Sequence, residues 1–311
     1  NATCCVSCTI TSPVVYARLL QVTRTPGRLW QDARTGSTGK PGVVVEPSPM
    51  RRARGMPDSL RVIRGDEWSA CLKARIGSAP QDMFDWMERN TRVLKSDIFS
   101  VAGQLELEGQ TCFLKFYHYK SVSRRMLFAL HRAPALRSYE AALALHRKGV
   151  PVPLPLACLR LSQGMLLLLE CIPGEGNLAE LWRDPPTEQR ARQIMHATGC
   201  SLALVHLGGY FHGDCKWNNL FWNGEQVFLV DLDAANRVRR RSARDYRDVA
   251  RFTLDAEERG VDPGLYDCFL ESYLEAAGKT RQEVMAGILP FLEKFRARHR
   301  VRYGSRGRQL L

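Results

Sequence analysis

The stretch from Tyr210 to Asp233 reads YFHGDCKWNNLFWNGEQVFLVDLD and decides how the rest of the chain is interpreted. Two short apolar runs in it flank Asn223-Gly224. This dipeptide is typical of the two-residue turn of a hairpin, because such a turn needs positive φ at both central positions. The hairpin would place Asn219 at its entrance and Asp231 at its exit. Oxygen side chains at neighbouring strand ends can hold a hard cation such as Mg²⁺, which takes its other ligands from phosphate and water.

The polar residues of this stretch fit the requirements of phosphoryl transfer. Asp214 would accept the proton of an attacking hydroxyl, while Asn219 and Asp231 would hold the metal on the nucleotide phosphates. A surface turn with ordinary capping Asp and Asn residues is the alternative interpretation, since short motifs also match by chance. The Asp that follows the expected hairpin favours the catalytic interpretation.

The stretch resembles the catalytic loop of the protein-kinase-like fold. That loop follows the pattern H-x-D-x-K-x-x-N, which is met here by His212, Asp214, Lys216 and Asn219. Two positions depart from protein kinases: Gly213 stands where they usually carry Arg, and Asp231-Leu232-Asp233 replaces Asp-Phe-Gly. Both departures are similar to the small-molecule and sugar kinases, which do not use that Arg to read a phosphorylated activation loop.

Size and charge narrow the class of protein further. The chain has 311 residues, enough for one bilobal domain or two small ones, and a formal net charge of +13. A field of that sign favours phosphate-rich partners, whether nucleotides, anionic lipid headgroups or nucleic acid, without choosing among them. No apolar run is long enough to span a bilayer, and the pattern of a secretory signal is missing. The scattered cysteines are expected to be buried structural residues in a reducing compartment.

Residues 1–55 differ in composition from the rest of the chain. They are rich in Thr, Pro, Gly, Ser and Arg and show little periodicity, so they are expected to form a disordered basic extension. A basic arm that binds an acidic surface is the functional alternative. Residues 56–311 would form a kinase-like domain, with an N-lobe over about 60–172 and a C-lobe over about 173–311.

Two alternating runs over residues 98–101 and 111–117 predict antiparallel strands joined by a turn at Glu108-Gly109. Lys115 lies in the second strand among apolar neighbours. A solvated Lys on an edge strand is one interpretation. The other is the phosphate-binding Lys of a kinase N-lobe, which projects from a strand under the nucleotide.

A phosphate-binding Lys needs a carboxylate partner on a helix. Residues 134–148 predict that helix, with Gly149 as its C-terminal stop, and Glu140 near its start is the candidate partner of Lys115. Surface helices carry Glu routinely, so a solvated Glu140 is the alternative.

A leucine-rich strand over residues 164–170 comes next in the chain. In the kinase resemblance it is the last N-lobe strand, and the main chain from Glu170 to Ile172 is the hinge that would bind adenine. A buried strand followed by a plain turn is the alternative. The segment 188–207 is then expected to form a long helix that delivers the chain to His212.

Two basic segments have two interpretations each. Residues 237–248 follow Asp233 closely, so their arginines are either a solvated face or a reader of an anionic acceptor. The tail 294–308 is either solvated or attached to an anionic membrane surface. Trp217 and Trp222 are expected to pack in the core.

Taken together, the motifs over residues 90–250 most resemble the bacterial lipopolysaccharide core kinases, the Kdo/heptose kinase (WaaP-like) family. The resemblance implies an α+β, bilobal protein-kinase-like fold with ATP and Mg²⁺ as cofactors. It further implies transfer of phosphate to a heptose or Kdo hydroxyl of the lipid A-linked core oligosaccharide, in the cytoplasm at the face of the inner membrane. The anionic surface of that membrane would be a second partner, and no nucleic acid is expected. The residues that carry the family pattern are Lys115, Glu140, Glu170, Ile172, Asp214, Lys216, Asn219 and Asp231.

Three other functions stay open from the sequence. An aminoglycoside or other amino-sugar acceptor would need an acidic pocket, in contrast to the arginines after Asp233. A protein kinase is disfavoured by Gly213 and by the missing Ala-Pro-Glu segment. A non-enzymatic nucleic-acid-binding protein would explain the charge but not the arrangement of Asp214, Asn219 and Asp231.

Overall fold

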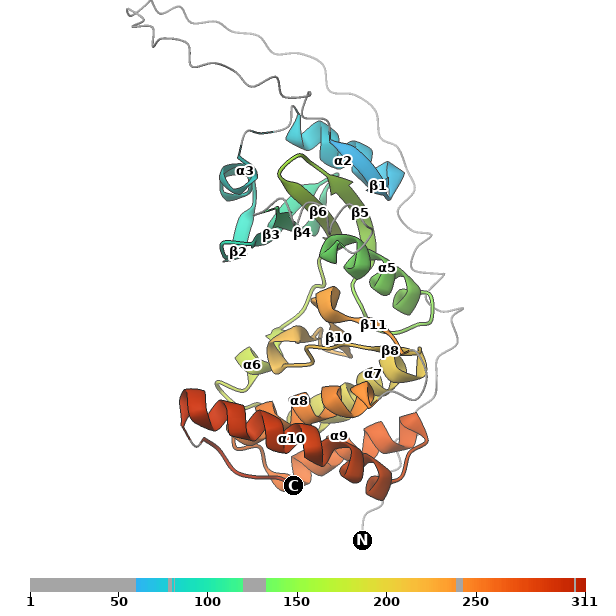
Figure 1. Ribbon diagram of the computed structural model, residues 1–311, viewed down its shortest axis with the longest axis vertical. Helices are drawn as coiled ribbons and strands as arrows, with labels where there is room; N and C mark the ends of the chain where they lie inside the picture. Colours follow the sequence, from blue (N-terminus) through green and yellow to red (C-terminus); the bar gives the residue numbers. More distant parts are fainter. Residues whose placement is uncertain (1–59, 78–79, 81, 120–132, 239–242, 305) are drawn as a thin grey trace, which may run out of the picture. The chain divides into compact units, whose positions relative to one another are not determined.

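The computed structural model describes residues 60–77, 80, 82–119, 133–238, 243–304 and 306–311. The chain divides into two units, Asn1–Met56 and Pro57–Leu311, and all described residues belong to the second. The disordered extension expected over residues 1–55 therefore lies outside the described residues. The second unit combines an antiparallel sheet with helices, which confirms the α+β class (Figure 1).

In the described part of the chain, the largest sheet has six antiparallel strands in the order β1-β5-β6-β4-β3-β2. The turn between β3 and β4 is the predicted Glu108-Gly109, and both residues have positive φ, 50° and 74°. The strands are β1 (Arg61–Arg64), β2 (Arg92–Ser96), β3 (Ser100–Leu107), β4 (Gln110–His118), β5 (Pro155–Arg160) and β6 (Gly164–Glu170).

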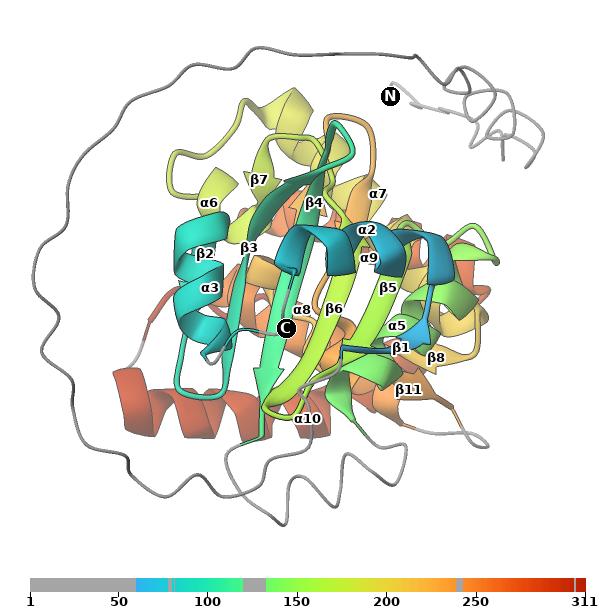
Figure 2. The ribbon, with the colours of Figure 1, turned by 90° about the horizontal axis from the view of Figure 1, so that it is seen from above.

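The two faces of this sheet have different roles because side chains alternate along a strand. Leu114 and Phe116 of β4 pack into an apolar cluster with α2 (Asp66–Ile76) and α3 (Met83–Asn90), and Figure 2 shows both helices over this face. Tyr117 packs on the opposite side, in a cluster with α5 (Pro134–His146). Lys115 has the same parity as Tyr117 and is thereby directed away from the α2 and α3 side.

Helices dominate the C-terminal part of the unit. The helix α7 (Glu188–Leu207) has the bounds predicted from the sequence. It packs along α9, while α8 packs against α10 (Figure 1). Trp217 and Trp222 are buried, as predicted, and the Phe252 and Phe269 rings stack at 3.8 Å in the same core. The helices are α6 (Leu178–Leu181), α7 (Glu188–Leu207), α8 (Arg244–Glu258), α9 (Pro263–Ala277) and α10 (Arg281–Tyr303).

Most basic side chains in the described part of the C-terminal segment are exposed, as in the solvated interpretation, but the segment is not a free tail. Residues 294–303 form the last turns of α10, which packs on α8. Arg296 anchors it, because its Nε donates to Glu257 Oε2 at 2.9 Å and its Nη2 donates to the carbonyl of Leu311. Part of the positive charge is therefore fixed in the fold. None of the helices among the described residues has the length and apolar character needed to cross a membrane.

The predicted hairpin is present, but the prediction of a two-residue Asn223-Gly224 turn is wrong. The strands β9 (Leu220–Trp222) and β10 (Val227–Leu229) pair antiparallel, and residues 223–226 connect them. Only Gly224 has positive φ in this turn, because Asn223 uses its side chain instead: its Oδ1 accepts from the N–H groups of Glu225 and Gln226. The remaining short strands are β7 (Gly176–Asn177), β8 (Tyr210–Phe211) and β11 (Asn236–Arg237).

Candidate active site

The loop from His212 to Asn219 is held by Asp248, a buried carboxylate on α8. The N–H of His212 donates to Asp248 Oδ2 at 2.5 Å, and the N–H of Gly213 donates to Oδ1 at 2.9 Å. Two consecutive main-chain groups therefore share one carboxylate, and the loop before Asp214 is fixed in place. Sequence reasoning missed Asp248 because it lies at the end of the arginine-rich run. Its place beside the buried Val249 and Ala250 of an amphipathic helix could have indicated a buried carboxylate.

Gly213 occupies its position for a steric reason. Its φ is +82°, and a Cβ placed there would lie 2.7 Å from the carbonyl oxygen of Ala234. The loop therefore passes directly against the segment that follows Asp231. A side chain as large as the Arg of protein kinases does not fit here, which explains this departure from their pattern.

Within the loop, Asp214 and Lys216 are in contact. Lys216 Nζ donates to Asp214 Oδ2 at 2.7 Å, and Asn219 Nδ2 donates to the same oxygen at 3.2 Å and to the Asp214 carbonyl at 2.9 Å. The Asp214 carboxylate keeps 42% of its side-chain surface exposed, so it is accessible from solvent.

The hairpin brings Asn219 beside the segment of Asp231. The N–H of Val230 donates to the carbonyl of Asn219 at 2.9 Å, and Leu220 pairs with Leu229. Asp231 has φ 59° and ψ 60°, a left-handed conformation that is uncommon outside glycine and that occurs preferentially at functional sites.

The donor set at these positions fits Mg²⁺. The amide nitrogen of Asn219 donates to Asp214, so its amide oxygen stays available as a metal ligand, and the main chain of Asn219 is bonded to Val230, the neighbour of Asp231. Mg²⁺ is commonly held by one or two protein oxygens and completes its shell with phosphate and water. Among the described residues there is no group of three His, Cys, Asp or Glu side chains that could hold a metal ion.

Lys115 reaches the same place from β4. Its Nζ lies 2.8 Å from Asp231 Oδ1 and 2.7 Å from Asp233 Oδ2, and 15% of its side chain is exposed. Burial opposes the charge of the ammonium, but Asp233 and Asp231 outweigh it and raise the pKa of Lys115. Burial likewise opposes ionisation of Asp231, and the ammonium outweighs it and lowers the pKa of that carboxyl. Both groups are therefore charged at neutral pH.

Tyr117 and Asp233 belong to the site although neither was among the candidates. Tyr117 OH donates to Asp233 Oδ1 at 2.6 Å, and burial together with this carboxylate raises its pKa well above the ordinary value. The signal was the matched spacing of two residues in Lys115-x-Tyr117 and Asp231-x-Asp233. On β4 that spacing puts Lys115 and Tyr117 on one face, and they meet Asp231 and Asp233 at the start of the 3-10 helix Leu232–Ala234.

The expected ion pair between Lys115 and Glu140 is wrong. Helix α5 buries Leu136 and Tyr139 on the sheet, and this orientation turns Glu140 toward solvent. The Glu140 carboxylate accepts a hydrogen bond from Arg64 Nη2 of β1 at 3.1 Å. Asp231 and Asp233 are the carboxylates on Lys115 instead. The cofactor-binding role expected for Glu140 has no support in this arrangement.

The hinge candidates lie at the end of β6. The N–H of Glu170 is donated to the carbonyl of Leu154 at 2.9 Å, so it is not free for a nucleotide. An adenine here would have to use the Glu170 carbonyl and the main chain of Ile172, where regular structure has ended.

The arginine-rich segment divides among several environments. Arg237 Nε donates to Tyr210 OH at 2.8 Å, and the guanidinium of Arg244 lies 4.7 Å from the centroid of the Phe211 ring. Residues 239–242 lie outside the described residues. Arg247 borders a cavity that Asp214 also lines.

The antiparallel sheet with its helices, the Lys115–Asp231 ion pair and the contact of Asn219 with Asp214 fit the protein-kinase-like class. The family comparison agrees: residues 84–273 match the model of the lipopolysaccharide kinase (Kdo/WaaP) family. The match covers more than half of the chain, so the protein belongs to this family and is a phosphotransferase. No match was found among the curated proteins compared with it.

Proposed function

We propose that the protein transfers the γ-phosphoryl group of ATP to a heptose or Kdo hydroxyl of the lipopolysaccharide inner core. The observation that carries the proposal is the contact of Lys115 with Asp231, next to the hairpin that links Asp231 to Asn219 and the loop of Asp214. The family supports a kinase that acts on lipopolysaccharide. ATP, the acceptor sugar and the residue roles are the parts proposed here.

The reaction is an in-line displacement at phosphorus. The oxygen of the sugar hydroxyl forms a bond to the γ-phosphorus, and the bond from that phosphorus to the bridging oxygen of ADP breaks. The bridging electron pair leaves with ADP, and the hydroxyl proton passes to Asp214 and then to solvent. Lys216 is in contact with Asp214 and offsets negative charge that grows on the transferred group.

The nucleotide side of the site consists of Lys115, Asn219 and Asp231. Asn219 and Asp231 would hold Mg²⁺, which neutralises the β- and γ-phosphate oxygens when bound. Lys115 would exchange part of its contact with Asp231 and Asp233 for a phosphate oxygen. Tyr117 keeps Asp233 in place through its hydroxyl, so one carboxylate remains to orient the ammonium.

The site of action is proposed to be the anionic surface of the cytoplasmic face of the inner membrane. The acceptor is anchored there by lipid A, and the net charge of +13 favours an anionic surface. Nucleic acid is not a proposed partner, because charge by itself does not require the Lys115 and Asp231 arrangement.

An acceptor panel tests the proposed function. The purified protein would be incubated with ATP, Mg²⁺ and, in separate reactions, core oligosaccharide, an aminoglycoside and a peptide mixture, with mass spectrometry as the readout. We expect one added phosphate on the core oligosaccharide. Phosphate on the aminoglycoside or the peptides, with none on the oligosaccharide, would replace this function by another kinase activity of the same fold.

A further inference from the structure

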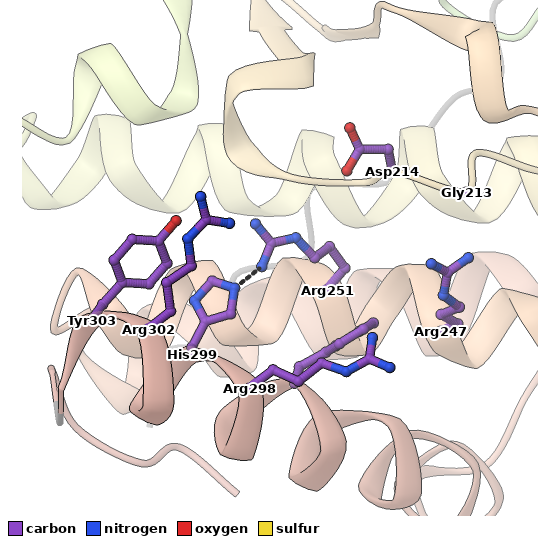
Figure 3. Close-up of a pocket in the computed structure, with 9 residues that line it drawn as sticks. Gly213, Asp214, Arg247, Arg251, Arg298, His299, Arg302 and Tyr303 are labelled. Carbon is purple, nitrogen blue, oxygen red and sulfur yellow. Dashed lines mark hydrogen bonds between the residues drawn. The ribbon is translucent and has the colours of Figure 1, made fainter.

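A cavity of about 280 Å³ lies between the loop of Asp214, α8 and α10. Figure 3 shows Asp214 on one side of it and, facing it, Arg247 and Arg251 of α8 with Arg298 and Arg302 of α10. The volume is near the lower end for small-ligand pockets, roughly 300–1,000 Å³. It suits a single sugar unit and is too small for a folded partner.

One of the four arginines is already committed to partners within the protein. Arg251 Nη2 lies 3.2 Å from Asp255 Oδ1, and its Nη1 lies 3.4 Å from His299 Nε2. His299 in turn contacts Glu258 Oε1 through Nδ1 at 2.6 Å. The charge of Arg251 is therefore balanced, and this chain of contacts connects α8 to α10 across the floor of the cavity.

The other three arginines have no such balance. Among the described residues, Arg247, Arg298 and Arg302 have no carboxylate within ion-pair distance, and the Arg302 guanidinium lies over the ring of its neighbour Tyr303, 5.2 Å from the centroid. Like charges gathered in one cavity repel each other, and an oxyanion relieves that repulsion. The guanidinium fork matches carboxylate and phosphate oxygens in pairs.

The cavity is distinct from the proposed nucleotide side. Lys115, Asn219 and Asp231 do not line it, whereas Asp214 does. A ligand in the cavity thus approaches the proposed proton acceptor from the side of the two helices. An oxyanion bound there belongs to the acceptor and not to the triphosphate.

We propose that this cavity is the acceptor subsite, in which Arg247, Arg298 and Arg302 bind a carboxylate or phosphate of an anionic saccharide and thereby present its hydroxyl to Asp214. The inference rests on the proposed function and adds where the acceptor binds and why it must already be anionic. Arg298 and Arg302 lie outside the residues 84–273 that match the family. Acceptor recognition therefore depends on a helix beyond the family-matched part of the chain.

A double variant of α10 tests the subsite. In Arg298→Gln/Arg302→Gln, we expect the KM for core oligosaccharide to rise roughly 10- to 100-fold, because hydrogen bonds to charged groups are lost, while the KM for ATP keeps its wild-type value. Arg247→Gln tests the α8 side and should change the same parameter in the same direction. Arg300→Gln is the matched control, since Arg300 is an exposed arginine of the same helix outside the cavity lining. Equal acceptor KM values in the double variant and this control would overturn the subsite.

Modified acceptors identify the source of the oxyanion. Core oligosaccharide would be compared with its methyl-esterified and its enzymatically dephosphorylated forms. If the arginines bind a carboxylate, esterification raises the wild-type KM, and if they bind a phosphate, dephosphorylation raises it. A wild-type KM that neither treatment changes contradicts an oxyanion subsite.

Calorimetric binding separates failure of this inference from failure of the proposed function. If the wild-type protein transfers no phosphate to any form of the oligosaccharide, the proposed function fails, and titration of the oligosaccharide without nucleotide decides about the cavity. Binding that is weakened in the double variant but not in Arg300→Gln supports the subsite. Equal binding by all three proteins, or no binding by any, overturns it.

Discussion

Asp231 connects the two halves of the site at the scale of single residues. Its carboxylate contacts the Lys115 ammonium, and its main chain follows the hairpin strand that pairs back to Asn219. Asp231 has a left-handed φ of 59°, a conformation that Asp tolerates better than a bulky residue does. In this conformation its short side chain contacts Lys115. The unusual backbone conformation therefore fits a residue whose carboxylate must point in one particular direction.

Substitution of Asp231 should remove metal-dependent nucleotide binding. In Asp231→Asn the carboxylate is replaced by a neutral amide of the same shape, so we expect ATP affinity in the presence of Mg²⁺ to fall at least about tenfold. Calorimetric titration with and without Mg²⁺ measures it. Asp184→Asn is the control, because Asp184 is exposed and is not a partner of Lys115. Wild-type affinity in Asp231→Asn would remove Asp231 from the metal site.

The ion pair of Lys115 should also give a defined pH dependence of stability. The pKa of Asp231 is lowered, so its stabilising contribution is complete above the ordinary pKa of Asp, about 3.9, and is lost as the pH falls through the lower folded value. The pKa of Lys115 is raised, so its contribution is complete below about 10.4 and is lost as the pH rises through the higher folded value. Between these limits the pair stabilises the fold fully.

Replacement of Lys115 by Met should lower the free energy of unfolding at pH 7 by about 1–3 kcal/mol, since two partly buried carboxylates are left without a cation. The loss should shrink as the pH falls from 7 to about 4, because without the Lys115 ammonium, which lowers the pKa of Asp231, burial favours the protonated form of this carboxyl in the variant. Urea unfolding at several pH values measures both effects. A loss that is independent of pH would show that packing, and not charge, accounts for it.

At the scale of elements, the catalytic loop depends on two neighbours that hold its main chain. Asp248 of α8 accepts two consecutive N–H groups, and Gly213 passes against the carbonyl of Ala234. The loop and the segment after β10 are therefore positioned together. A change at their contact should affect both stability and catalysis.

Gly213→Ala tests this contact. The positive φ and the approach of Ala234 should together lower the free energy of unfolding by about 1–3 kcal/mol, and the displaced loop should also lower kcat. Gly278→Ala is the matched control, because Gly278 has φ +63° but open space around an added Cβ. It should cost less stability and leave kcat unchanged. Equal effects of both substitutions on stability and kcat would contradict the close contact.

Sequence periodicity was sufficient to predict the main helices and strands, but not the hydrogen bonds that side chains make at the turns. The boundaries of β6 follow from an uninterrupted apolar run, and those of α7 follow from apolar residues at helical spacing and the glycines after it. The turn at Glu108-Gly109 follows from its φ requirements. The four-residue turn after β9 was missed because the side chain of Asn223 competes with a two-residue turn. Local rules fail where a side chain supplies the hydrogen bonds itself.

The candidate site was predictable where neighbours in sequence carry it and not where distant elements meet. Asp214, Lys216 and Asn219 lie within six residues, and their contacts follow from the loop. The partner of Lys115 was assigned to Glu140 because the helix carried a suitable acid. The actual partners come from 116 and 118 residues away, and only the packing of α5 decides against Glu140.

At the scale of the whole molecule, positive charge is sorted by position. Arg296 is paired with Glu257 inside the fold, whereas Arg247, Arg298 and Arg302 gather beside Asp214. The positive charge behind the net +13 is therefore not evenly distributed. Some of the arginines without an acidic partner line a cavity next to the proposed proton acceptor. This distribution fits an anionic acceptor held by a phosphotransferase.

The central claim is that Asp214 receives the proton while phosphate passes from ATP to a core sugar. The most direct test is a comparison of wild-type protein with Asp214→Ala in a quench-flow assay with ATP, Mg²⁺ and core oligosaccharide, in which phosphorylated oligosaccharide and ADP are measured by mass spectrometry. We expect equal amounts of the two products from the wild type and a rate that is lower by roughly 10²–10⁴-fold in the folded variant. Phosphorylation at the wild-type rate by Asp214→Ala would contradict the claim.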